Sequence, residues 1–126
     1  MFSLGLPPIW IGVLSAKLQL PGSRSLKARR QVLRSLRDRL RHRFAVSVHE
    51  LTISERADAA GLVVSTAGQD PGSIRQTIDR IASVVDSHPS AVITSLDKEV
   101  FRWHPPGQDW ADLIDDRPLV EDDGDG

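Results

Sequence analysis

The sequence predicts an α+β domain in which two helices cover one face of a four-stranded antiparallel sheet. Two observations support this prediction. Four segments have the apolar alternation or β-branched composition of short strands, and two segments carry apolar residues at the helical period. Turn and cap residues separate them in the order strand, helix, strand, strand, helix, strand. Two βαβ units in this order fold with both helices on one side of the sheet.

The first strand is expected over residues 9–20. One of its faces consists of Leu14, Ala16, Leu18 and Leu20. The opposite face begins with Ile9, Ile11 and Val13. On a bare sheet these residues would form an exposed apolar patch, so we expect a cover: a second copy of the chain, or the chain's own ends, namely residues 1–8 or Trp103 and Trp110.

A helix is expected over residues 26–43, after the turn at Pro21 and Gly22 and with Ser25 as its N-cap. Its apolar positions follow the helical period and must face a core: Leu26, Leu33, Leu36, Leu40 and Phe44. Residues 45–53 and 61–66 are rich in β-branched and aliphatic side chains, and turn residues lie between them. We therefore expect these two segments to form an antiparallel pair.

Asp70 and Pro71 predict the start of the second helix as an N-cap followed by Pro at the first helical position. Its expected buried face consists of Ile74, Ile78, Ile81, Ala82 and Val85. His88 and Pro89 end it, and residues 91–96 supply the last strand, with Val92, Thr94 and Leu96 on one face. The complete order is that of the ferredoxin-like fold. We expect an extension at residues 1–8, the domain at 9–103, and an acidic, flexible tail at 104–126.

Composition limits the class of protein. The 126 residues suffice for one domain with a core, and the absence of Cys excludes disulfides and thiolate metal sites. No apolar run approaches the roughly 20 residues that span a membrane, and no signal peptide is recognisable at the start. A soluble protein of the reducing cytoplasm, with no membrane association, is expected.

Charge is unevenly distributed although the net charge is only -1. Residues 24–43 hold nine of the sixteen Lys and Arg residues and one acid, Asp38, whereas residues 105–126 hold eight acids and one base, Arg117. Many Arg codons are expected from a GC-rich genome, but codon bias does not explain the clustering. The asymmetry predicts a polyanionic partner for the basic helix, or an intramolecular contact between the tail and that helix.

The basic helix is the candidate binding site. Five of its bases follow spacings of 3, 4, 3 and 4 along one flank of the apolar stripe, and they define what we call the cationic ridge: Lys27, Arg30, Arg34, Arg37 and Arg41. The ridge is about 20 Å long at 1.5 Å per residue, enough to meet several phosphates of a nucleic acid. The alternative is an ordinary solvated helix face whose Arg stems cover the edge of the core.

The loop before this helix is a second candidate. Gly22, Ser23 and Ser25 precede the free N–H groups of the helix start, and Arg24 and Lys27 add positive charge, so the loop could bind an anion. The alternative is a simple turn with a Ser cap. Because Arg24 adds positive charge at the start of the basic helix, it is included among the candidate nucleic-acid-binding residues.

No catalytic or cofactor motif is found. An RRM-type platform needs aromatics on the central strands, and a KH clamp needs G-x-x-G; neither occurs. There is no P-loop and no Gly-x-Ser-x-Gly, and the chain has no Asn of the kind that orients water in acylphosphatases. The four His residues lack metal-ligand spacing and are expected at the surface or as caps: His42, His49, His88 and His104. A protein without enzymatic activity, metal or cofactor is expected.

A short pattern resembles a known family. The residues that carry it are Gly12-Val13-Leu14, Leu18 to Gly22, Ser25-Leu26-Lys27 with Arg30 and Val32-Leu33, Arg43-Phe44, Val46-Ser47-Val48 with Glu50, Arg56-Ala57, the apolar run ending at Ser65, and Ser87-His88-Pro89. Over residues 9–100 the chain resembles the YlxP-like family, domain of unknown function 503. The segment at residues 49–57 is shorter than is usual for that family.

The resemblance implies a small ferredoxin-like protein without established catalytic residues, often encoded near translation and ribosome-maturation genes. Together with the cationic ridge it predicts a non-enzymatic protein that binds RNA or a ribosomal particle through charge and shape, with salt-sensitive and weakly sequence-selective binding. The alternative is a protein-interaction or homodimerisation module, with dimerisation through the sheet and no direct nucleic-acid function.

Overall fold

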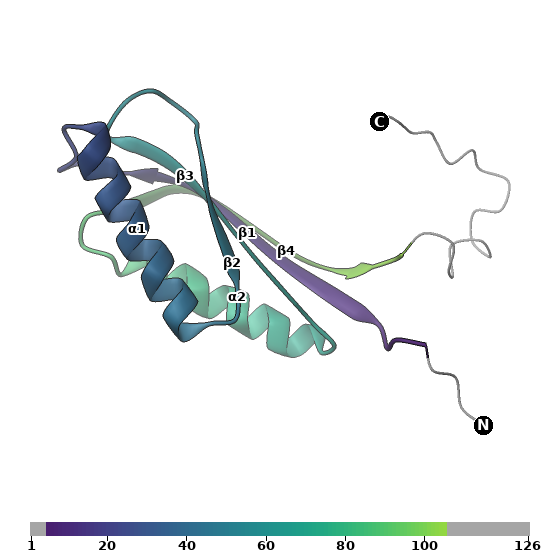
Figure 1. The fold of residues 1–126 in the computed structure, drawn as a ribbon. Coiled ribbons are helices and arrows are strands. Elements are labelled where there is room, and N and C mark those ends of the chain that lie inside the picture. Colours follow the sequence, from purple (N-terminus) through teal and green to yellow (C-terminus); the bar gives the residue numbers. More distant parts are fainter. Residues whose placement is uncertain (1–4, 106–126) are drawn as a thin grey trace, which may run out of the picture.

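The computed structural model describes residues 5–105, and its elements follow one another in the predicted order. They are β1 (Ile9–Gln19), α1 (Leu26–Arg43), β2 (Ser47–Leu51), β3 (Ala59–Gly68), α2 (Pro71–Asp86) and β4 (Val92–Trp103). The sheet is antiparallel with strand order β2-β3-β1-β4, and both helices lie on the same side of it (Figure 1). The predicted ferredoxin-like α+β fold is confirmed. Residues 1–4 and most of the predicted acidic tail lie outside the described residues.

The core lies between the helices and the sheet. The alternation of β1 is confirmed, since Leu14, Leu18 and Leu20 are fully or almost fully buried there. Other core residues come from both helices and β3: Leu33, Leu36, Leu40, Leu62, Val64, Ile74, Ile78, Ile81, Val84 and Val85. The predicted face of α2 was wrong in one position, because Val84 is buried whereas Ala82 is only half-buried.

Side-chain caps fix where the helices start. The Ser25 hydroxyl accepts a hydrogen bond from the Ala28 N–H at 3.0 Å, as expected of an N-cap. Asp70 caps α2 by accepting from the N–H groups of Gly72 and Ser73. The Ser73 hydroxyl also donates to Asp70 at 2.7 Å, and this bond, with the two backbone bonds, lowers the pKa of the Asp70 carboxyl. Both predicted helix starts are confirmed.

Gly12 allows α2 to approach the middle of β1 closely. A Cβ atom at Gly12 would lie 2.6 Å from Ile74 Cγ2 and 2.9 Å from Ile78 Cγ1. These distances are too short for any side chain without movement of the helix. The absence of a side chain at this position therefore determines how deeply α2 packs on the sheet.

The prediction for the last strand was wrong in length and in phase. β4 extends to Trp103, and its register with β1 shifts at Lys17 and Leu18, which oppose Ser95 and Ile93. Thr94 is the extra residue of this β-bulge, and its hydroxyl donates to the Lys17 carbonyl at 3.2 Å. The bulge breaks the period of two, so Ile93 and Leu96 pack against the core.

The middle strands also differ in extent from the predicted segments. β2 is shorter than residues 45–53, and β3 is longer than residues 61–66, with five cross-strand pairs between them from Ser47↔Ser65 to Leu51↔Gly61. The predicted antiparallel pairing is confirmed.

The second face of the sheet, which we call the open face, carries no helix among residues 5–105 (Figure 1). Ile9, Ile11 and Val13 of β1 lie on it, as predicted from their alternation with the core residues. The pairing places Trp103 beside Ile9 and Phe101 beside Ile11 on this same face. Phe101 was not predicted there, and Trp103 was expected only as a cover from the end of the chain, because the last strand was expected to end at Leu96.

Candidate nucleic-acid interface

The cationic ridge lies along α1, and most of its side chains are exposed to solvent. Among the candidate residues Arg24, Lys27, Arg30, Arg34 and Arg41 are exposed, and Arg37 is half-buried. The helix is regular from Leu26 to Arg43, so the spacing predicted from the sequence holds without a break. Lys27 and Arg41 are fourteen residues apart, which corresponds to about 21 Å along the helix axis.

The ridge lies on the flank of α1 that faces away from α2. Around the helix axis, at 100° per residue, the side-chain directions of Ser35 and Arg39 differ from that of the ridge by roughly half a turn. These two residues are therefore on the opposite flank. The Ser35 hydroxyl lies 3.2 Å from Nε2 of His88, in the connection that follows α2. Figure 1 shows α1 and α2 next to each other on one side of the sheet, and the flank of α1 away from α2 carries the exposed bases of the ridge.

Arg37 differs from the other members of the ridge. Its Nε lies 3.7 Å from Oδ1 of Asp38, which is an ion pair but too long for a hydrogen bond, and this buried Nε has no hydrogen-bond partner in the protein. The guanidinium is thus partly withdrawn from solvent and partly neutralised. Lys27, Arg30, Arg34 and Arg41 are the more accessible positive charges.

Arg29 belongs to the basic cluster in sequence but serves a structural purpose. Its Nη1 donates to the carbonyl oxygens of Ser54, Arg56 and Ala59, at 3.2, 2.8 and 3.3 Å. This fixes the connection between β2 and β3 to α1. The sequence signal for this role is the position of Arg29 on the helical wheel, close to Leu33 and Leu36 and outside the ridge.

The same connection contains an internal ion pair. Arg56 donates to both carboxylate oxygens of Asp58, at 2.9 and 2.8 Å. The hydrogen bonds and the opposite charge raise the pKa of Arg56, and the hydrogen bond from Arg56 lowers the pKa of the Asp58 carboxyl. Arg56 is consequently a poor candidate for binding an external anion.

The predicted anion loop is a tight turn. The Ser23 N–H donates to the Leu20 carbonyl at 2.9 Å, and the Ser23 side chain is buried. Ser25 uses its hydroxyl as the helix cap, and Gly22 is exposed with no heavy atom within 4 Å of where its Cβ would lie. Of this loop only Ser23 is buried, and Pro21, Gly22, Arg24 and Ser25 are exposed at the end of the ridge.

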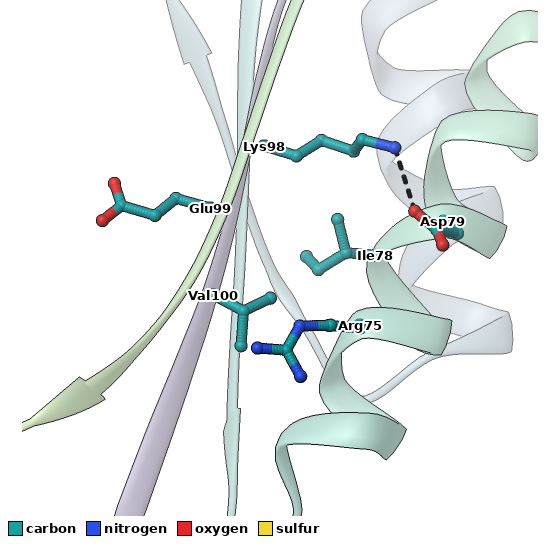
Figure 2. A pocket seen from close by; sticks show the side chains of 6 residues that line it. All are labelled: Arg75, Ile78, Asp79, Lys98, Glu99 and Val100. Carbon is teal, nitrogen blue, oxygen red and sulfur yellow. Dashed lines mark hydrogen bonds and ion pairs between the residues drawn. The ribbon is translucent and has the colours of Figure 1, made fainter.

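Two surface depressions lie beside α2. One has a volume of about 220 Å³ and lies between α2 and β4, lined by Arg75, Ile78, Asp79, Lys98, Glu99 and Val100 (Figure 2). Lys98 Nζ donates to Asp79 Oδ1 at 2.9 Å across it, while Glu99 points to the other side of the strand. Lys98 and Asp79 thus pair with each other, and no nucleophile with an adjacent base lines the depression.

The second depression, of about 520 Å³, lies where α1 ends and α2 begins. Arg43 lies over the ring of Phe44 there, 5.8 Å from its centroid. Asp70 also lines it, and this carboxylate already accepts from the first N–H groups of α2. An anion at this helix start would meet the negative charge of the cap.

His88 is a buried structural residue. The Ser90 N–H donates to its Nδ1 at 3.1 Å, so Nδ1 is unprotonated and Nε2 carries the hydrogen that Ser35 accepts. Burial, aided by the positive charge of Arg39, lowers the pKa of His88. His88 therefore ties α1 to the connection between α2 and β4 as a neutral imidazole.

Within residues 5–105 no three His, Asp or Glu side chains are grouped so that they could hold a metal ion. None of the helices there is both long and apolar enough to cross a membrane.

A known protein family matches most of the described residues. The profile of the family described as "Protein of unknown function (DUF503)" matches residues 11–98, which span β1 to the middle of β4. The chain belongs to this family. The match includes the whole cationic ridge, so the basic helix is part of the DUF503 domain. A search for similar sequences among curated proteins found no match.

Several solved structures share the general arrangement of this DUF503 chain at low identity. The designed protein Foldit4 has 13% identity and a TM-score of 0.45, with 77% of this chain and 98% of that chain covered. The C-terminal segment of the alpha subunit of aIF2 from Pyrococcus abyssi has 14% identity and a TM-score of 0.41, with 80% and 53% covered. The putative chlorite dismutase TA0507 has 15% identity and a TM-score of 0.47, with 89% and 49% covered. Similarities this weak support no functional conclusion.

Proposed function

We propose that this DUF503 protein is a non-enzymatic, cytoplasmic RNA-binding protein that contacts the phosphate backbone of a structured RNA or a ribosomal particle. The observation that carries the proposal is the line of four exposed bases along one flank of α1. Lys27, Arg30, Arg34 and Arg41 point away from the core, and none of them forms an ion pair within residues 5–105.

The geometry favours contacts to phosphates over reading of bases. Arg guanidinium groups donate in pairs to phosphate oxygens, and several of them in a row match a chain of phosphates better than a single acidic side chain. The exposed part of the ridge contains no aromatic residue on which a base could stack. Binding should therefore depend on the charge and shape of the RNA and only weakly on its sequence.

Sedimentation of cell lysate at physiological salt tests the proposal. We expect the wild-type protein to travel with ribosomal particles, and the variant Arg30→Gln, Arg34→Gln, Arg41→Gln to remain at the top of the gradient. A matched control removes three positive charges elsewhere: Arg39→Gln, Arg43→Gln and Arg80→Gln, all exposed and off the ridge. Wild-type protein that stays at the top, or a control that behaves like the ridge variant, would contradict the proposal.

A further inference from the structure

The open face of the sheet concentrates apolar side chains that water would otherwise contact. Six large apolar residues are exposed within residues 5–105, and four of them lie on this face or at its border: Leu51 at 43%, Ile53 at 44%, Val92 at 51% and Trp103 at 43%. Leu51 and Ile53 pack over Gly61 of β3, while Val92 and Trp103 lie at opposite ends of β4. Between them lie the half-buried Ile11, Val13 and Phe101. Such a surface indicates an interface.

Charged and polar residues on the open face are arranged asymmetrically. Asp97 and Glu99 lie on the open-face side of the edge strand β4, since they pair with Ser15 and Val13. Lys17 of the central strand β1 is also exposed on this face, in the next row. His49 lies at the other edge, on β2, in the same row as Asp97, because Ser15 pairs with Val63 and Val63 pairs with His49. The two acids outnumber Lys17 and disfavour a nucleic acid as the occupant, so the partner of this face differs from the partner proposed for the ridge.

We propose that the open face binds the open face of a second copy of this chain, with the twofold axis parallel to the strands. This axis places β4 of one copy over β2 of the other, so Asp97 of each copy faces His49 of the other and can accept a hydrogen bond from it. An axis perpendicular to the strands would instead place β4 over β4 and bring the acids together. Of the two ways in which the faces can meet with their strands aligned, the charge arrangement therefore favours the axis parallel to the strands.

The size and shape of the face fit this occupant. The face is four strands wide at about 4.8 Å per strand, and its length is that of an eleven-residue strand at about 3.3 Å per residue. Its area is therefore up to about 690 Å². That is close to the roughly 800 Å² that each partner contributes to a standard interface. β2 begins at Ser47, which lies in the same row across the sheet as Glu99. Phe101 and Trp103 of β4 would therefore extend beyond the start of β2 of the other copy, towards Ala67 of its β3.

A charge exchange tests both the dimer and its axis. Sedimentation equilibrium of the full chain should show a dimer for the wild type. Asp97→Arg should raise the dimer Kd about 10-fold, because the symmetric interface places two such charges against His49. Adding His49→Glu to that variant should restore the Kd to within about 3-fold of the wild type.

The rescue distinguishes this contact from damage to the fold. Within one copy Asp97 and His49 are separated by three strand spacings, about 14 Å, so they make no direct contact. Asp86→Arg is the matched control, since it makes the same charge change at the exposed end of α2 and should leave the Kd unchanged. A wild-type chain that is monomeric at millimolar concentration overturns the proposal; it is also the result expected if the chain's own ends cover the face. A dimer that the second substitution fails to rescue overturns the proposed axis.

Discussion

The salt dependence of RNA binding gives the sharpest test of the cationic ridge. We assume that each of the four exposed ridge side chains, Lys27, Arg30, Arg34 and Arg41, neutralises one phosphate. Each such contact contributes about 0.7–0.9 to the slope of log K against log salt, so the wild-type slope should be about -2.8 to -3.6. Between about 50 and 200 mM salt the Kd should rise about 50- to 150-fold.

Replacing Arg30, Arg34 and Arg41 with Gln leaves one exposed contact, Lys27. The slope should fall to about -0.7 to -0.9, so the same change in salt should raise the Kd only about 3-fold. Fluorescence anisotropy with a labelled structured RNA, repeated at four or more salt concentrations, measures both slopes. The off-ridge control described above removes the same number of charges and should keep the wild-type slope, because the lost charges do not contact phosphate.

Two results would refute this reasoning. Equal slopes for the ridge variant and the off-ridge control would mean that net charge, and not the ridge, determines binding. A wild-type slope near zero would mean that phosphate contacts do not contribute to the affinity at all.

Three further predictions concern the fold that positions the ridge. In a urea titration Gly12→Ala should lower the free energy of unfolding by about 1–2 kcal/mol, because overpacking against α2 outweighs the reduced freedom of the unfolded chain. The control is Gly22→Ala, whose Cβ meets no atom within 4 Å. It should leave the free energy of unfolding unchanged or raise it by up to about 1 kcal/mol. Arg29→Met should cost about 1–2 kcal/mol and speed amide exchange in residues 52–58, since Met keeps an apolar stem but offers no donor to the three carbonyls. Unchanged exchange there would contradict the assigned role. The folded protein disfavours protonation of His88, so the pKa of His88 is lower in the folded than in the unfolded chain. The contribution of neutral His88 to the free energy of unfolding should therefore be complete above about pH 6.5 and should decline as pH falls below that value. If the free energy of unfolding of a His88→Gln variant declines as steeply between about pH 7 and 5, His88 is not the cause.

The sequence predicted the fold well where local patterns agreed with tertiary packing. Ser25 and Asp70 marked the helix starts because a cap acts on the first turn of its own helix and needs no distant partner. The alternation of β1 was equally informative, since one of its faces is buried under both helices. By contrast, the β-bulge at Thr94 depends on pairing with Lys17, seventy-seven residues away in sequence, and no local pattern contains that information.

The candidate site could be predicted only in part for a related reason. Helical spacing correctly placed the ridge on one exposed flank, but exposure of each side chain depends on neighbours that come from elsewhere in the chain. Arg29 is held by carbonyls of the β2–β3 connection, and Arg37 is half-buried. The role of His88 likewise depends on Ser35 of another helix. Contacts between distant segments therefore divide a uniform basic cluster into exposed and structural members.

The position of β1 in the sheet has a consequence for synthesis of the chain. β1 is made first, yet it pairs with β3 on one side and with β4, the last strand, on the other. After β3 is complete, the 35 residues from Gln69 to Trp103 must still be made before the second edge of β1 can pair, which takes about 2–7 s at typical elongation rates. During that interval an eleven-residue strand presents unpaired backbone groups beside the apolar residues of the open face. The nascent chain is thus most exposed to misassociation after the ridge helix has been made and before the sheet is complete.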